Sequence, residues 1–418
     1  MQDWPISKLE DLTEDARPIT YGVVKPGPED PIYGVKFIRG GDIFEGKLAT
    51  ESLRTITHEV SRAYARTLLK GGELVVSLVG NPGHVAIIPK SLAGANLARQ
   101  AGLVALRLDV DAHFVKYFLM SPLGRAELFS QMTGSVQVVI NLANLRGVRI
   151  PLPPLPIQRR IAGILSAYDD LIENSQRRIK ILEEMARRLY REWFVHFRFP
   201  GHEGCMLVES PLGEIPEGWE VVDLGTVCLN PKGIQTGPFG SQLHESDYSA
   251  EGVPVVMPKD LIDYRIRVQG VAFIPEETAH RLDRHRMQSG DIVYGRRGDI
   301  GRRAFIMPHQ VGWLCGTGCL RIRPDPQLVD PWYLFNALGQ DDVVALIRGR
   351  AQGVTMPNLN TSLLETVPLR LPPSNLQCQF SALSYPLATA RENLSATIDN
   401  LRRTRDLLLP RLLSGQID

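Results

Sequence analysis

Residues 153–194 read PPLPIQRRIAGILSAYDDLIENSQRRIKILEEMARRLYREWF, and a related opening, PPSNLQ, stands at residues 372–377. Proline cannot supply the N–H of an interior helical residue, so each Pro-Pro pair predicts the start of a helix just after it. Apolar or small residues then recur in alternating steps of four and three, which is the spacing of a coiled-coil seam. Pro386 is expected to kink or delay the second helix. The seam positions are Ile161, Leu165, Tyr168, Ile172, Ser175, Ile179, Leu182, Ala186, Leu189 and Trp193 in the first helix, and Phe380, Leu383, Leu387, Ala390, Leu394, Thr397, Leu401, Thr404 and Leu408 in the second.

The chain before each Pro-Pro pair is also repeated. Residues 72–88 align without gaps on residues 290–306, an offset of 218 (290 minus 72). A repeat of this length is too long for a solenoid unit, so it predicts two tandem domains. Further matches follow in the same order: residues 106–108 with 320–322, 117–119 with 332–335, 141–142 with 358–359, and 148–158 with 367–377.

These patterns predict a mixed α/β fold. Apolar runs at residues 73–79 and 85–88 indicate two strands of a hairpin, with Gly80 and Gly83, like Gly298 and Gly301, forming turns at positive φ. The two long helices are expected to run antiparallel and bury each other, relating two globular domains by a pseudo-twofold axis. The alternative is that each helix packs on its own domain. The predicted boundaries are residues 1–152 and 201–371 for the globular domains, and 153–200 and 372–418 for the helical spacers.

Composition narrows the class of protein. The 418 residues carry 47 Lys plus Arg against 46 Asp plus Glu, a formal charge of +1, with 44% hydrophobic residues. This balance excludes a disordered, collagen-like or uniformly basic chain. The sequence shows neither a secretory leader nor an apolar run of 18 residues, so we expect a cytoplasmic protein without membrane contact. Five cysteines without a CxxC pair favour reduced thiols, and Cys315 with Cys319 lacks further ligands for zinc.

The second globular domain carries a basic cluster, and the first has a weaker basic signature. Between residues 281 and 303 there are seven arginines and three aspartates, a local balance of +4 (7 minus 3). Planar arginine side chains suit guanine edges and phosphates, so the cluster favours nucleic-acid binding. A solvated surface of salt-bridged arginines is the alternative.

Together these features resemble the specificity subunit of type I restriction-modification enzymes along essentially the whole chain. The resemblance rests on the two Pro-Pro segments with their long helices and on the closing LLLPRLLSGQID from Leu407. It also rests on GPFGSQL at residues 237–243, GVPVVMPKDL at 252–261 and GDIVYGRRGDIGRRAFI at 290–306.

This resemblance implies two target recognition domains, each reading one half of a bipartite, asymmetric sequence in double-stranded DNA. The helices would dock two methyltransferase (M) subunits, with motor-nuclease (R) subunits outside. This chain would be non-catalytic and bind no cofactor, because the partners would use S-adenosylmethionine, ATP and Mg.

Candidate DNA contacts come from both domains. An arginine that forks onto guanine O6 and N7 is the contact with the clearest chemistry. The candidates of the second domain are Gln235, Thr236, Ser241, Lys259, Arg296, Arg297, Arg302 and Arg303, and those of the first are Thr20, Tyr21, Lys25, Arg39, Asn81 and His84.

Catalytic alternatives find little support in the sequence. There is no P-loop motif, and Asn81-Pro82-Gly83 departs from the Asn-Pro-Pro-aromatic motif of amino-methyltransferases at its third position, so we interpret it as a turn. Residues 28–30 (PED) and 45–47 (EGK) have the spacing of a metal-dependent nuclease, a pattern that also arises by chance. The remaining alternative is a two-headed coiled-coil adaptor that binds proteins and has no affinity for DNA.

Overall fold

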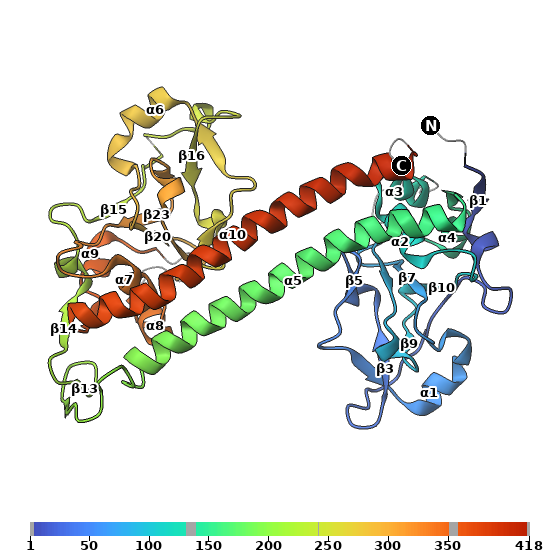
Figure 1. Ribbon diagram of the computed structural model, residues 1–418, viewed down its shortest axis with the longest axis horizontal. Helices are drawn as coiled ribbons and strands as arrows, with labels where there is room; N and C mark the ends of the chain where they lie inside the picture. Colours follow the sequence, from blue (N-terminus) through green and yellow to red (C-terminus); the bar gives the residue numbers. More distant parts are fainter. Residues whose placement is uncertain (1–3, 131–138, 241, 351–357, 416–418) are drawn as a thin grey trace. The chain divides into compact units, whose positions relative to one another are not determined.

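The computed structural model describes residues 4–130, 139–240, 242–350 and 358–415 (Figure 1). Two compact units divide the chain: unit 1 comprises residues 1–178 and 394–418, and unit 2 comprises residues 179–393. Each unit contains one globular part and a segment of each long helix. The contacts therefore do not follow the linear boundaries at residues 153 and 372.

The two long helices begin where the Pro-Pro pairs predict. Helix α5 spans Leu155–Phe194 and helix α10 spans Ser374–Leu413. The predicted delay at Pro386 is wrong, since α10 starts twelve residues earlier (386 minus 374) and continues through it. Pro386 and Ala382, whose carbonyl loses its helical partner, are both exposed. Water can therefore satisfy that carbonyl.

Every predicted seam position of α5 is buried or half-buried, as a packed helix face requires. The seam of α10 is partly wrong: Leu383 is 54% exposed, and Thr397 and Thr404 are exposed too. The buried positions there include Ser384 and Arg391, and polar partners explain their burial. Ser384 accepts a hydrogen bond from Trp332 Nε1 at 2.8 Å, and Arg391 lies 3.8 Å from Glu183.

The globular parts of the two units share one strand order. Each has a four-stranded antiparallel sheet, a three-stranded mixed sheet and two strand pairs, and helices follow in corresponding positions. In unit 1 the sheets are β2(Thr20–Tyr21)-β10(Ala101–Val104)-β7(Leu74–Ser77)-β8(Val85–Ile87), β6(Arg54–Ile56)-β3(Val35–Ile38)-β9(Asn96–Leu97), β4(Ile43–Phe44)-β5(Lys47–Leu48) and β1(Ile6–Lys8)-β11(Arg149–Pro151), with helices α1(His58–Ala63), α2(Ala112–Met120), α3(Pro122–Phe129) and α4(Leu142–Arg146).

Unit 2 repeats this order and adds a short hairpin of its own. Its elements are β15(Ile234–Thr236)-β23(Cys319–Ile322)-β20(Ile292–Gly295)-β21(Arg303–Phe305), β19(Ala272–Ile274)-β16(Val253–Val256)-β22(Leu314–Cys315), β17(Leu261–Ile262)-β18(Arg265–Ile266), β14(Glu220–Asp223)-β24(Pro368–Leu371) and the added β12(Leu207–Val208)-β13(Ile215–Pro216), with α6(Glu276–Arg281), α7(Pro331–Ala337), α8(Asp341–Arg350) and α9(Thr361–Glu365).

Strand registers confirm the hairpin alignment but correct two of the sequence matches. Ser77 pairs with Ala101 as Gly295 pairs with Cys319, so residues 102–104, not 106–108, correspond to 320–322. Asn141 and Asn360 both cap a short helix, α4 and α9, through their side-chain oxygens. Asn141 therefore corresponds to Asn360, and the predicted match with Asn358 is wrong by two residues.

A buried glutamine joins each long helix to the globular part of the same unit. In unit 1, Gln158 accepts the backbone N–H of Asp111 at 2.8 Å and donates to the carbonyl of Pro153 at 2.8 Å. In unit 2, Gln377 accepts the N–H of Asp330 at 2.8 Å and donates to the carbonyl of Pro372 at 2.7 Å.

Both glutamines are 1% exposed. The aspartate that each one binds is the N-cap of α2 or α7, the helix that packs on the four-stranded sheet. The start of each long helix is thus tied to the helix that covers the sheet.

Both long helices enter the core of each unit. In unit 1, Asp169 of α5 accepts the Tyr117 hydroxyl at 2.6 Å and pairs with Arg405 of α10 at 2.7 Å. In unit 2, Phe194 of α5 lies 5.1 Å from Phe380 of α10 and 4.9 Å from Tyr333, measured between ring centroids.

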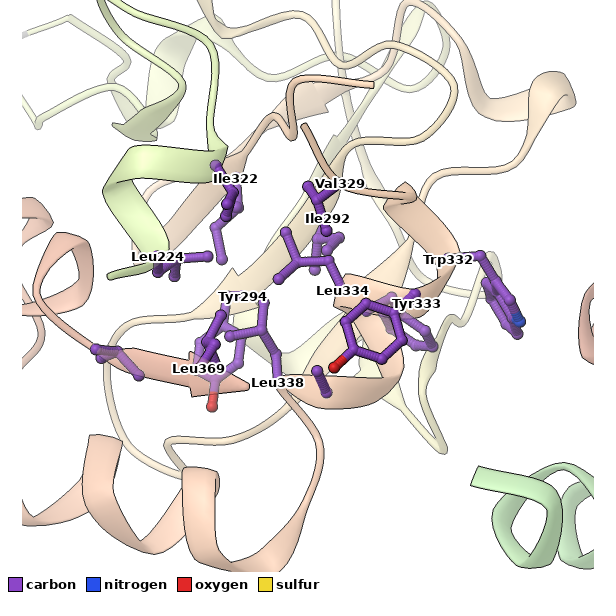
Figure 2. Packing of buried hydrophobic residues seen from close by; sticks show 14 of the residues in the cluster. Leu224, Ile292, Tyr294, Ile322, Val329, Trp332, Tyr333, Leu334, Leu338 and Leu369 are labelled. Carbon is purple, nitrogen blue, oxygen red and sulfur yellow. The ribbon is translucent and has the colours of Figure 1, made fainter. Parts of the chain in front are cut away.

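Figure 2 shows part of the core of unit 2, where side chains of β20, β23 and α7 converge. The Tyr190–Phe380 contact and the Glu183–Arg391 pair show that α5 and α10 run antiparallel within this unit.

None of the helices in the described residues is both long and apolar enough to cross a membrane.

We predict that Gln158→Ala lowers the free energy of unfolding of unit 1 by about 2–4 kcal/mol, because one buried N–H and one buried C=O lose their partners. Gln377→Ala is expected to have the same effect on unit 2. Chemical denaturation monitored by circular dichroism measures both. Gln176→Ala on α5 is the control, with an expected change below about 0.5 kcal/mol. A loss in Gln158→Ala no larger than in the control would contradict the structural role of the glutamine.

Candidate nucleic-acid interface

The candidate residues of the two units occupy equivalent places. Thr20 and Tyr21 lie on β2, the edge strand opposite Leu103 and Gly102, and Gln235 and Thr236 lie on β15 opposite Arg321 and Leu320. Asn81 and His84 lie in the turn between β7 and β8, and Arg297 and Arg302 lie in the corresponding turn between β20 and β21. The four turn glycines all have positive φ, from 74° at Gly298 to 112° at Gly301, as predicted.

In unit 2 the end of the edge strand β15 and the turn between β20 and β21 lie together at one end of the four-stranded sheet. The N–H of Gly237, just after β15, donates to the carbonyl of Cys319, and the N–H of Arg296 donates to the carbonyl of Gly318. The exposed ring of Phe239 therefore lies near the turn, with its centroid 5.7 Å from the guanidinium carbon of Arg296.

Arg296 is held in place without an acidic partner. Its Nε donates to Asn358 Oδ1 at 3.0 Å, and its carbonyl accepts the N–H of Leu359. Within the described ranges no carboxylate lies at ion-pairing distance from it. Partial burial, followed by the charge of Arg297, lowers the pKa of the guanidinium. The outer nitrogens of Arg296 are thus oriented and remain available to an external acceptor.

Asn358 and Phe239 are functional candidates that the sequence interpretation missed. Phe239 lies in the GPFGSQL motif, which is the signal that pointed to it. No local pattern marks Asn358, since it is separated from Arg296 by 62 residues and meets it only through the fold.

The other arginines of the turn differ in their environments. Arg297 is exposed. Arg302 Nε lies 2.9 Å from Asp299 Oδ2, and the other oxygen of Asp299 pairs with Arg348 at 3.2 Å. Arg302 is therefore partly neutralised, as the salt-bridged alternative expects.

Arg303, which the sequence predicts as a DNA contact, is buried in the structure. It is 6% exposed, its Nε donates to the carbonyl of Phe335 at 3.0 Å, and its guanidinium carbon lies 4.7 Å and 4.9 Å from the ring centroids of Tyr264 and Phe335. The strand alternation of β21 turns this residue toward α7, which a count of arginines does not reveal.

Arg321 is a second residue that the sequence interpretation missed. It is 5% exposed and donates to Gln235 Oε1 at 3.0 Å and to the carbonyls of Lys232 and Arg284 at 3.0 and 2.9 Å. It fixes the Gln235 amide, whose Nε2 has no acceptor among the described residues. Beside it, burial lowers the pKa of His285 to about 4, so this imidazole is neutral at physiological pH.

The remaining candidates of unit 2 are less defined. Thr236 is half-buried and Lys259 is exposed on the turn after β16. Ser241 lies outside the described residues.

In unit 1 the candidates carry less positive charge. Arg39 pairs with Asp42 at 2.8 Å, a contact that raises the pKa of the arginine. His84 stacks on Phe44 with ring centroids 5.0 Å apart, and burial followed by the charge of Arg125 lowers its pKa. Tyr21, Lys25 and Asn81 are exposed, and Thr20 is half-buried.

Residues of the predicted nuclease pattern make other contacts in the structure. Glu29 is paired with Arg54, and Lys47 lies 2.8 Å from Glu173 of α5. Glu45 forms the tight turn between β4 and β5, where its φ is 45°. Likewise, Asn81-Pro82-Gly83 is a turn, as predicted.

Comparisons with known proteins find similarity to specificity subunits of type I restriction enzymes. Residues 1–184 match the family described as type I restriction modification DNA specificity domain. The MjaIX specificity subunit of Methanocaldococcus jannaschii is 25% identical over 433 residues, covering 100% of this chain and 94% of that protein. The EcoBI specificity subunit of Escherichia coli is 29% identical over 176 residues, 41% of this chain and 37% of its own length.

A solved structure shares the fold. The crystal structure of a type I restriction-modification S subunit from M. genitalium superposes with a TM-score of 0.65 at 16% identity, covering 98% of this chain and 96% of that one. These findings support the resemblance in the sequence to the specificity subunits of type I restriction-modification enzymes.

Proposed function

We propose that this chain is the sequence-recognition subunit of a type I restriction-modification complex and that each unit reads one half of a bipartite, asymmetric target in double-stranded DNA. The observation that carries the proposal is a shared scaffold with different side chains at equivalent positions. By strand register, Leu78 corresponds to Arg296 and Thr20 to Gln235. Two globular parts with the same strand order but different donors and acceptors suit two different half-sites.

In unit 2 the reading surface would centre on Arg296. An arginine without a carboxylate partner, fixed by Asn358 and backed by the Phe239 ring, can direct two N–H groups at guanine O6 and N7. Arg297 and Lys259, which are exposed, suit phosphate contacts that give affinity without sequence information. Gln235, oriented by Arg321, would offer its amide donors to a base edge.

The long helices would form an antiparallel coiled coil between tandem recognition domains and dock two methyltransferase subunits, with motor-nuclease subunits outside. Apolar side chains on the outer faces of the helices support this role, since exposed apolar surface favours association. These residues are Leu171, Ile181 and Met185 on α5 and Leu383 and Leu407 on α10, each more than 50% exposed. The near-zero net charge fits a subunit whose partners share the phosphate contacts.

The partner subunits would then carry out the catalytic reactions. Methyl transfer would use S-adenosylmethionine, and translocation with cleavage would use ATP and Mg, while this chain would hold no cofactor and act beside them in the cytoplasm.

The experiment that tests the proposal is co-expression of the chain with its methyltransferase subunit, followed by mapping of methylated adenines across the host DNA. We expect one interrupted, asymmetric motif. A stable complex that methylates no motif and shows no salt-dependent DNA binding would instead support the protein-binding adaptor.

We predict that Arg296→Met relaxes the specificity at one base pair of one half-site. Loss of a bidentate arginine-guanine contact costs about 1–3 kcal/mol of discrimination, or roughly 5- to 150-fold in relative affinity for the correct base pair. Competition binding of the complex to oligonucleotides that differ at single positions measures this change. Arg302→Met, which removes an arginine already paired with Asp299, is the control and should weaken binding evenly across sequences. Unchanged discrimination in Arg296→Met would show that Arg296 does not read a base.

A further inference from the structure

Unit 2 contains a cavity of about 450 Å³ that the DNA-reading surface does not use. It lies among α5, α7 and α10, and its volume falls in the range of small-molecule sites. Aromatic side chains form much of its wall. They are Tyr190 of α5, Tyr264 after β17, and Trp332 and Phe335 of α7.

Two arginines that are more than nine-tenths buried also line this cavity. Arg303 is 6% exposed and Arg391 is 9% exposed. Arg391 Nη2 donates to Glu392 at 2.7 Å and its Nη1 lies 3.8 Å from Glu183, while its buried Nε has no hydrogen-bond partner. Burial raises the pKa of Glu183, although the charge of Arg391 opposes this shift.

Arg303 has even fewer partners. Only its Nε is hydrogen-bonded, to the carbonyl of Phe335, and across the described ranges no carboxylate lies within ion-pairing distance of it. Its Nη1 and Nη2 groups have no acceptor within those same ranges. A buried guanidinium normally has a carboxylate or several acceptors, since removing its charge from water costs several kcal/mol.

The surroundings of Arg303 fix its orientation. A Cβ on Gly339 would lie 1.3 Å from Nη2 of Arg303, so the guanidinium lies directly against bare backbone after α7. The ring centroids of Tyr264 and Phe335 lie 4.7 Å and 4.9 Å from its guanidinium carbon, within cation-π distance. The guanidinium thus packs against bare backbone and two aromatic rings, and its terminal N–H groups have no acceptor among the described residues.

The fold itself does not require an arginine here. Strand register makes Val85 of β8 the counterpart of Arg303 of β21, since Val85 pairs with Val76 as Arg303 pairs with Tyr294. Unit 1 forms the same sheet with a buried valine at this position. A fixed, unpaired cation on a cavity wall is therefore a feature of unit 2 alone at this strand position.

We propose that this cavity binds a planar organic anion: an aromatic or heteroaromatic ring that bears one carboxylate or phosphate. The anionic group would accept the Nη1 and Nη2 donors of Arg303, and the ring would pack against the aromatic wall. This inference does not depend on the proposed DNA recognition.

The first test compares 2-naphthoate with its uncharged analogue 2-naphthamide by isothermal titration calorimetry on the full chain. We expect the acid to bind at least tenfold more tightly, because only the acid supplies a charge for Arg303. The pair AMP and adenosine distinguishes phosphate from carboxylate as the preferred group. Equal binding of acid and amide, together with equal binding of AMP and adenosine, would overturn the proposal, as would no binding of any probe at millimolar concentration.

Two variants locate the site. Arg303→Met should abolish the preference for the anion, whereas Arg302→Met, which changes an arginine outside this cavity, should retain it. Ala186→Phe fills the cavity from α5 and should abolish binding of acid and amide alike. The comparison of probes on the unmodified chain remains decisive if Arg303→Met fails to fold. A preference for the anion that survives in folded Arg303→Met would contradict the assignment of Arg303.

Discussion

Two buried glutamines make the interaction on which the rest of the structure depends. Each accepts the N–H of an N-cap aspartate and donates to a carbonyl of the Pro-Pro pair, so the first turn of a long helix is joined to the helix that covers the four-stranded sheet. Because these bonds are buried and directional, they fix the start of the helix on its unit without using the turn or the edge strand. The residues of the turn and of the edge strand can then differ between the units, while the strand order and the attachment of the long helix stay the same.

Some arginines of unit 2 stabilise the fold, and others lie at its surface. Arg321 and Arg323 are structural: the first binds carbonyls and Gln235, and the second forms two 2.7 Å contacts with the buried Asp291. Arg296 is positioned by Asn358 but keeps free donors, and Arg297 is exposed. A chain with a formal charge of +1 can therefore present a local set of donors without being basic as a whole.

Much of the fold could be predicted from the sequence, because proline placement, helical periodicity and the repeated hairpin are local signals. The start of both helices, the seam of α5 and the turn glycines follow from them. The seam of α10 could not be predicted correctly, since the buried Ser384 and Arg391 are satisfied by Trp332 and Glu183, which are distant in sequence. The same reason applies to the site: the burial of Arg303 and the Arg296–Asn358 bond depend on pairings between distant segments.

The central claim is that the globular parts of the two units read DNA independently. Its most direct test replaces residues 201–371 with the corresponding segment of another specificity subunit, co-expresses the chimera with the methyltransferase subunit, and maps methylated adenines. Co-purification of the two chains shows that the complex has assembled. The account predicts that one half of the methylated motif changes and the other half stays the same. A motif in which both halves change, or neither does, would contradict it.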